Sequence, residues 1–215
     1  MPRARHLMNT LRQQTQQSRL TPPAHPIRAS VSFLQTHPLS FAPTQPIAMT
    51  HTRHAIFLNG PIGSGKTTLG RGLADRLAGG FIDGDDFSAA DRPWYCSIHS
   101  TSKAIVREGL TVLMHAPTVV IAYPLGCVNW IYYRRHFTDA GVRPFFVNLR
   151  ASYLSIVAAD RGRAFSAQER QRIKVMIDEG YAERRFSDLT VDTDQQDFAA
   201  TLDHLERTIR ERIFT

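Results

Sequence analysis

The chain has 215 residues, enough for one domain with a sizeable hydrophobic core. Its formal net charge of +7 at pH 7 would suggest a nucleic-acid partner if the charge were spread over the whole chain. However, the segment before residue 55 holds six arginines with no lysine and no acid, whereas the remainder has 20 basic and 19 acidic residues. The globular part is therefore nearly neutral, and we expect it to bind no nucleic acid.

Cysteine usage and hydropathy exclude other classes of protein. Cys96 and Cys127 are too few for a disulfide framework, and neither has the spacing of a metal site. A reducing, cytoplasmic compartment is the simpler expectation. No apolar run approaches the ~20 residues that a transmembrane helix needs, so we expect no membrane partner. We expect a monomer or a homodimer.

The first 53 residues are rich in Gln, Thr, Ser, Pro and Arg and show no sustained periodicity. We expect a disordered or spurious N-terminal extension over residues 1–53 and a folded domain over 54–215. Translation that begins at Met49, just ahead of the first strand, is one form of this hypothesis. An Arg-rich targeting segment and a nucleic-acid-binding arm are the alternatives.

The first strong motif follows an apolar run of strand length at 54–59. Residues 60–67 read GPIGSGKT and fit the phosphate-loop pattern G-x-x-x-x-G-K-[ST] at every defined position. After them, apolar residues recur at helical spacing over 67–77. The expected nucleotide-binding residues are Gly60, Pro61, Ile62, Gly63, Ser64, Gly65, Lys66, Thr67 and Thr68.

The residue types of this motif suit a bound polyphosphate. Glycines let the backbone turn so that successive N–H groups converge on phosphate oxygens, and the following helix directs its positive end at the same anion. Lys66 adds a cation for the outer phosphates, and the Thr67 hydroxyl can bind Mg²⁺. A structural Gly-rich turn without a ligand is the alternative interpretation.

Carboxylates cluster after the second expected strand, at 81–82. Asp83, Asp85 and Asp86 lie within four positions there. In a parallel sheet, ligands gather outside the carboxyl ends of the strands. We therefore expect these acids at the same edge as the phosphate loop; an acidic surface turn is the alternative.

The alternation of elements continues to the C-terminus. Residues 88–100 look irregular and aromatic, which suits either a substrate flap or a cover for the sheet edge. The third strand ends without an acid, so a Walker B carboxylate is missing there, and Arg134 with Arg135 is interpreted as a solvated helix face. The further expected elements are helices at about 101–113, 128–140, 152–159, 167–183 and 195–213, and strands at 118–123, 142–149 and 189–191.

A candidate lid lies between two of these helices, around 160–183. Arg161 and Arg163 flank a glycine, and Ser166 with Glu169 forms an S-x-x-E capping box that begins the next helix. Glycine allows hinging, and guanidinium groups can grip phosphoryl oxygens in a bidentate manner. An ordinary surface connector is the alternative.

Strands and helices alternate from residue 54 onward, which indicates an α/β fold with a parallel sheet and helices on both faces. The chain resembles the P-loop small-molecule kinases, notably shikimate kinase and gluconate kinase, over about residues 54–213. The resemblance rests on the motif at 60–68, on the D-x-D at 81–85, on the arginines at 161 and 163, and on 191–193 before the last helix.

The resemblance implies a P-loop NTPase-type three-layer fold. Its five-stranded sheet would have the order 2-3-1-4-5 and would carry a small lid. The cofactors would be ATP and Mg²⁺, and the γ-phosphoryl group would pass to a hydroxyl of a small-molecule acceptor. The loop at Asp192 and Thr193 would border the adenine.

The resemblance also implies roles for individual residues. Asp83 would hold Mg²⁺, through water, together with Thr67. Asp85 would touch the acceptor hydroxyl and act as its base. Arg161 or Arg163 would be the lid arginine that acts in catalysis beside Lys66.

The chain departs from the shikimate kinase pattern around the acceptor. Residues 123–126 read YPLG where that family has a Gly-Gly-Gly loop, and only Arg92 and Arg107 are candidates for its substrate-clamping arginine. The gluconate kinase pattern is not evident either, so the acceptor stays open. The alternatives are an antibiotic kinase, a nucleoside or nucleotide kinase, and a non-catalytic ATP-binding regulatory module.

Overall fold

The computed structural model describes residues 52–88, 94–158 and 163–214. Almost all of the expected N-terminal extension lies outside these residues, as do Arg92 and Arg161. The elements are β1 Arg53–Asn59, α1 Lys66–Arg76, β2 Gly80–Asp83, a 3-10 helix Gly84–Phe87, α2 Trp94–Val112, β3 Thr118–Ala122, α3 Cys127–Asp139, β4 Val142–Arg150, α4 Tyr153–Val157, α5 Ala167–Asp178, β5 Leu189–Asp192 and α6 Phe198–Ile213.

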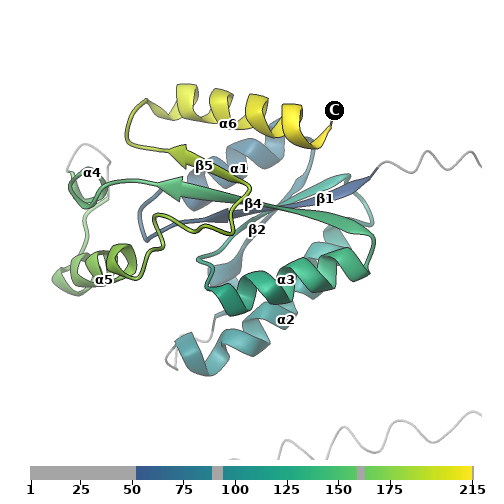
Figure 1. Cartoon of the computed structure of the whole chain (residues 1–215), viewed down its shortest axis with the longest axis horizontal. Coiled ribbons are helices and arrows are strands. Elements are labelled where there is room, and N and C mark those ends of the chain that lie inside the picture. The colour runs from purple at the N-terminus through teal and green to yellow at the C-terminus, as the bar shows by residue number, and fades with distance from the viewer. Residues whose placement is uncertain (1–51, 89–93, 159–162, 215) are drawn as a thin grey trace, which may run out of the picture. The chain divides into compact units, whose positions relative to one another are not determined.

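The five strands form one parallel sheet in the order β2-β3-β1-β4-β5. The central strands are buried on both faces, which is why β1 and β3 are continuous apolar runs instead of alternating ones. Helices α1 and α6 cover one face, and α2 and α3 cover the other (Figure 1). The predicted three-layer α/β fold and its strand order are confirmed.

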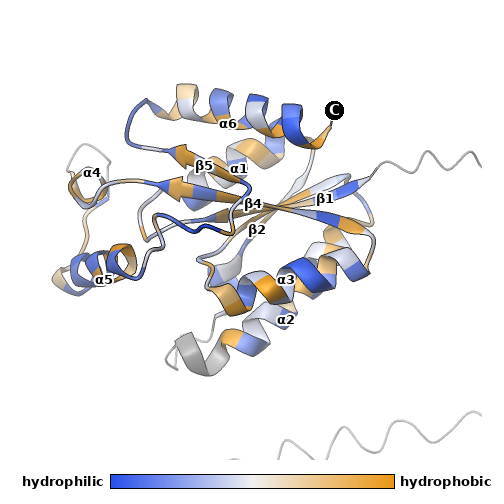
Figure 2. Ribbon diagram, in the orientation of Figure 1, coloured by the Kyte–Doolittle hydropathy of each residue, from blue (hydrophilic) through white to orange (hydrophobic). Residues whose placement is uncertain are grey.

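Each face of the sheet has its own apolar core. Leu73 of α1 and Leu205 of α6 are fully buried on one side, and Ile105 of α2 and Phe137 of α3 on the other. The outward sides of the helices carry the polar residues, so that α3 and α6 show both colours in Figure 2. Within the described ranges, no helix has the length and apolarity that crossing a bilayer requires.

Several helix boundaries differ from the sequence-based expectation. Helix α2 already begins at Trp94, so residues 94–100 are helical and the irregular conformation predicted there is wrong for that part. The Thr101 hydroxyl donates to the carbonyl of Phe87 (3.0 Å), which ties α2 to the preceding 3-10 helix. Tertiary contacts of this kind outweigh the weak helix propensity of aromatic and serine residues.

Helix α5 is shorter than expected, because it ends at Asp178 instead of Glu183. Gly180 adopts a left-handed φ of 78°, and the amide of Tyr181 donates to the carbonyl of Met176 (3.0 Å), as at a glycine-terminated helix end. Helix α6 begins at Phe198, because the Asp197 side chain caps it by accepting from the amide of Ala200 (2.8 Å).

A buried histidine, His54, is the second residue of β1. His54 is 2% exposed, and neither ring nitrogen has a hydrogen-bond partner within the described part of the chain. Its ring meets that of Phe214 edge-on, with centroids 5.0 Å apart. Burial, and secondarily the positive charge of Arg143, lowers the pKa of His54 below its usual value of 6.5.

We predict that His54→Phe reduces the dependence of the free energy of unfolding on pH below about pH 6.5. The unfolded chain binds a proton at His54 near pH 6.5, whereas the folded chain resists it, so the free energy of unfolding falls as the pH drops below that value. The slope that the variant loses is at most about 1.4 kcal/mol per pH unit. Urea unfolding between about pH 7.5 and 5 measures it.

His115→Gln is the matched control, because His115 is exposed. It should keep the slope of the wild type. A variant His54→Phe with an unchanged slope would show that another group controls the acid response.

Candidate functional site

The loop between β1 and α1 depends on three glycines for its path. Gly60, Gly63 and Gly65 have φ values of 151°, 79° and 91°, which side-chain-bearing residues rarely adopt. A Cβ on Gly60 would lie 2.6 Å from the carbonyl oxygen of Leu149, and one on Gly63 would lie 2.6 Å from Ile156. The loop is therefore closely packed against neighbouring segments; that it cradles phosphate stays a prediction.

Lys66 begins helix α1 and turns back over the loop. Its Nζ donates to the carbonyls of Gly60 (3.0 Å) and Pro61 (2.8 Å). Burial lowers the pKa of Lys66 to about 8, against the opposing effect of the carboxylates Asp85 and Asp83. A bound polyphosphate would offset this desolvation and favour the charged form.

Asp83 connects the second strand to the phosphate loop. Its Oδ2 accepts a hydrogen bond from the Thr67 hydroxyl (2.9 Å), and its Oδ1 accepts from the amide of Asp85 (3.2 Å). The second bond caps the 3-10 helix Gly84–Phe87, an element that the sequence did not indicate. Thr67 and Asp83 thus present adjacent oxygens, and Mg²⁺ favours one or two protein oxygens plus water and substrate phosphates, so these residues fit that ion.

The 3-10 helix places Asp85 beside the loop lysine. Asp85 is exposed, but part of its carboxyl group is shielded from solvent, and this desolvation raises its pKa. The charge of Asp83 adds to the rise, whereas that of Lys66 opposes it. The structure therefore brings Lys66, Thr67, Asp83 and Asp85 together at one sheet edge, as the order of strands and loops predicted.

Tyr123 forms the floor beneath this helix. Its ring packs so closely on Gly84 that a Cβ there would lie 2.4 Å from the ring, and Tyr123 itself is 7% exposed. Burial, and next the charge of Asp85, raises the pKa of the Tyr123 hydroxyl. Tyr123, the first residue of the YPLG segment after β3, therefore supports the helix that carries Asp85.

Two buried asparagines at the ends of β1 and β4 were not identified from the sequence. The Nδ2 of Asn59 donates to Oδ1 of Asn148 (2.7 Å), and Oδ1 of Asn59 accepts from the amide of Leu125 (2.7 Å). Asn148 in turn donates to the carbonyl of Ala182 (2.5 Å). This network fixes the loop after β3 and the segment after α5; asparagine at the end of an apolar strand was its only signal.

The described part of the candidate lid packs on the phosphate loop. Phe165 joins Ile156 in a small apolar cluster that lies against Gly63 and includes Ile62. Arg163 pairs with Glu169 (2.9 Å) and lies over the Phe165 ring, 4.8 Å from its centroid. Its charge contributes to the lowered pKa of Lys66, which places Arg163 on the phosphate-loop side of the lid.

The loop after β5 is tied to the same site. The Thr193 hydroxyl donates to the carbonyl of Ser64 (3.1 Å), and its amide donates to the carbonyl of Arg150 (2.9 Å). Asp192 forms a two-point ion pair with Arg150, in which Nη2 lies 2.8 Å from Oδ2. Thr193 therefore touches the phosphate loop, while the carboxylate of Asp192 is bound to Arg150; their contact with an adenine stays a prediction.

An arginine after α5 was also missed by the sequence analysis. The guanidinium of Arg184 lies 4.0 Å from the ring centroid of Tyr181, and its Nη1 donates to the carbonyl of Glu179 (3.1 Å). Its Nε is buried and has no partner among the described residues. Tyr181 in turn is close enough to contribute to the raised pKa of Tyr123. Of the arginines expected to clamp the acceptor, Arg107 is exposed on α2.

We predict that Gly63→Ala destabilises the fold by about 2–4 kcal/mol, because it adds a left-handed φ for alanine to a clash with Ile156. Gly141→Ala is the matched control, since Gly141 has a similar φ of 72° but open space around it. The control should lose only about 1 kcal/mol. Equal losses in urea unfolding would mean that Ile156 does not press on the loop at Gly63.

The comparisons with known proteins agree with this geometry. No family model matches the chain. A shikimate kinase from Psychrobacter sp. (strain PRwf-1) is 33% identical over 124 residues, which cover 54% of this chain and 67% of that protein. A shikimate kinase from Vibrio parahaemolyticus is 27% identical over 169 residues, or 73% of this chain and 96% of that protein.

A solved structure shows the same fold. Shikimate kinase from Acinetobacter baumannii in complex with shikimate superimposes with a TM-score of 0.51 and 20% sequence identity, covering 75% of this chain and 93% of that one. The fold, the phosphate loop with its two carboxylates, and the identity to the Psychrobacter enzyme lead to one conclusion. The chain belongs to the P-loop small-molecule kinases, the ATP-dependent enzymes among which shikimate kinase is found.

Proposed function

We propose that this kinase moves the γ-phosphoryl group of ATP to a hydroxyl of a small metabolite, with residues 54–215 as its catalytic domain. One observation supports this most directly: Asp85 lies beside Lys66, and its amide donates to Asp83, whose other oxygen binds Thr67 of the phosphate loop. With Asp83 assigned to Mg²⁺, the second carboxylate is not needed to hold the metal, and without a metal it would repel phosphate. It suits a group that accepts a proton from the nucleophile.

The phosphate loop would hold the nucleotide. Its amides from Gly63 to Thr67 and the ammonium of Lys66 would share the negative charge that spreads over the transferred group. Thr67 and Asp83 would hold Mg²⁺, which would supply positive charge against the phosphates. Lys66 would exchange its two loop carbonyls for phosphate oxygens, since both carbonyls belong to the loop that the nucleotide occupies.

Asp85 would act on the acceptor. Its carboxylate orients the hydroxyl and takes up the proton as the new O–P bond forms and the bond between the γ-phosphorus and the bridging oxygen breaks, releasing ADP. Arg161 or Arg163 would approach the transferred group from the lid. For Arg163 this requires release from Glu169, an exposed ion pair that costs little to break.

We further propose that the acceptor carries a negative charge. Arg184 lies against Tyr181, which with Asp85 influences the pKa of Tyr123, and its buried Nε has no partner within the described residues. A guanidinium edge in this state suits a carboxylate or phosphate of the acceptor. Shikimate, the ligand of the Acinetobacter neighbour, is one such anion. Because the loop at 123–126 differs from the shikimate kinase pattern, a sugar acid is the other candidate.

We predict that Lys66→Ala and Asp85→Asn each lower kcat by at least about 100-fold, because one removes charge stabilisation and the other removes the base. ATP turnover with a panel of sugar acids and polyols measures this. Asp86→Asn is the matched control, since Asp86 is the exposed next residue of the same 3-10 helix. Near-wild-type turnover in Asp85→Asn would remove the assigned base. Turnover that no acceptor stimulates would favour the regulatory module.

We predict that Arg184→Gln raises KM for an anionic acceptor by at least about 10-fold, while KM for ATP stays within about twofold. The neighbouring Arg185 is exposed, so Arg185→Gln should leave both values unchanged. Steady-state kinetics with each substrate varied in turn gives the answer. A change in the KM for ATP alone would place Arg184 on the nucleotide side instead.

A further inference from the structure

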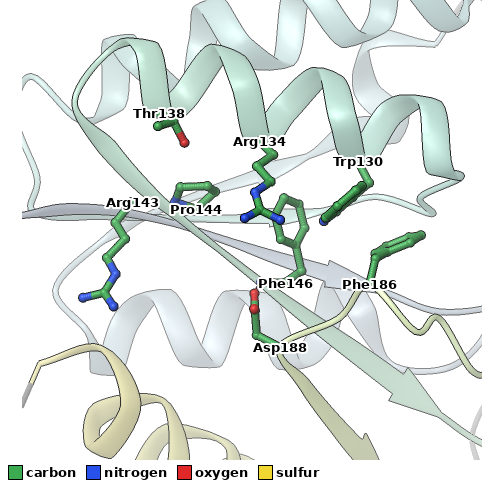
Figure 3. A pocket seen from close by; sticks show the side chains of 8 residues that line it. All are labelled: Trp130, Arg134, Thr138, Arg143, Pro144, Phe146, Phe186 and Asp188. Atoms are coloured by element: carbon green, nitrogen blue, oxygen red, sulfur yellow. Dashed lines mark hydrogen bonds between the residues drawn. The ribbon is translucent and has the colours of Figure 1, made fainter.

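A cavity lies away from the phosphate loop. It has a volume of about 230 Å³ and lies between α3, the first half of β4 and the segment before β5. In the parallel sheet this half of β4 pairs with the beginning of β1, whereas the phosphate loop follows the end of β1. The kinase site and the cavity are thus at opposite ends of the strands. Its lining residues are Trp130, Arg134, Thr138, Arg143, Pro144, Phe146, Phe186 and Asp188 (Figure 3).

Aromatic rings form the apolar walls of this cavity. Trp130 and Phe186 are stacked, with centroids 5.2 Å apart and an angle of 21° between the rings. Phe146 meets Trp130 edge-on at 6.1 Å. An apolar cavity of about 150 Å³ already admits benzene. The volume here therefore suits a molecule with a single flat ring and one or two substituents.

Two unused hydrogen-bond donors face this cavity. The Nε1 of Trp130 is buried and has no partner among the described residues, and Figure 3 shows it on the side of the ring that faces Arg134 and Phe146. The guanidinium of Arg134 lies 5.2 Å from the Trp130 ring. Arg134 is exposed and makes no hydrogen bond or ion pair in the described part of the chain, so its guanidinium can reorient toward a ligand.

A carboxylate lies across the cavity from these donors. Asp188 accepts from the amide of Phe146 through one oxygen (2.8 Å), which fixes its side chain. It makes no ion pair with Arg134, although both line the cavity. Figure 3 shows the two approaching from different elements, α3 and the segment before β5. The cavity is thus positive and donor-rich on one side, aromatic in the middle, and acceptor-bearing on the other.

We propose that this cavity is a second ligand-binding site, for a small carboxylate with a flat ring. The carboxylate would accept from Arg134 and from the Trp130 N–H, and the ring would lie against Phe146 and Phe186. A hydroxyl at the far end of the ring would donate to Asp188. Satisfying the buried indole N–H is the specific gain, because an unpaired buried donor costs about 1–3 kcal/mol. The site is independent of the proposed kinase reaction.

Calorimetric titration with 4-hydroxybenzoate, without nucleotide or acceptor, tests this site. We expect saturable binding with a dissociation constant below about 1 mM. Arg134→Gln should weaken it by at least about 10-fold. Arg135→Gln is the matched control, because Arg135 is the exposed next residue, pairs with Asp139 and does not line the cavity. 4-Hydroxybenzyl alcohol, which lacks the carboxylate, should bind at least about 10-fold more weakly.

Fluorescence gives an independent readout, because the chain has only two tryptophans. In a Trp94→Phe background, Trp130 is the one remaining tryptophan. Binding of the probe should then change the tryptophan fluorescence with the same dissociation constant. Equal binding to Arg134→Gln and Arg135→Gln, or no saturation up to about 10 mM, would overturn the proposal. Loss of binding in Arg184→Gln would also overturn it, since the probe would then occupy the acceptor site. A failed kinase assay would affect none of these results.

Discussion

The parallel pairing of β1, β2 and β3 is the constraint on which the kinase site depends. It brings Asp83, at the end of β2, level with Ala122 at the end of β3, and Ala122 is level with Leu58 of β1. The phosphate loop and the carboxylates therefore leave the sheet at one edge. Only at that shared edge can the hydroxyl of Thr67 reach Asp83. The chemistry of phosphoryl transfer needs little else from the protein than such positioning and charge.

The positions of these groups are fixed by contacts that take no part in the chemistry. The side chain of Asn59 holds the loop after β3 through the amide of Leu125, and Tyr123 in that loop supports the helix of Asp85 from below. Thr193, in the loop after β5, donates to the carbonyl of Ser64 in the phosphate loop. Each of these is a single polar or close-packed contact inside a buried environment, where geometry is held tightly because a displaced group would lose its partner.

The two ends of the sheet differ in how charge is used. At the carboxyl end, the charge of Asp83 acts on the pKa of both Lys66 and Asp85. At the other end, Arg134 and Asp188 line one cavity without pairing, with an unsatisfied indole N–H from Trp130 nearby. Both arrangements keep charged groups available instead of neutralising them internally. Groups left in that state are expected where a ligand completes the network.

Local sequence determined the fold class, the phosphate loop and the acids of the second strand, because each depends on residue type and spacing over a short stretch. The start of α2 at Trp94 and the 3-10 helix that carries Asp85 depended on contacts with distant residues, which no local pattern encodes. Arg184 and the Asn59 network could be identified only in three dimensions, since ordinary arginines and asparagines look the same in a sequence until burial leaves them with one possible partner or none.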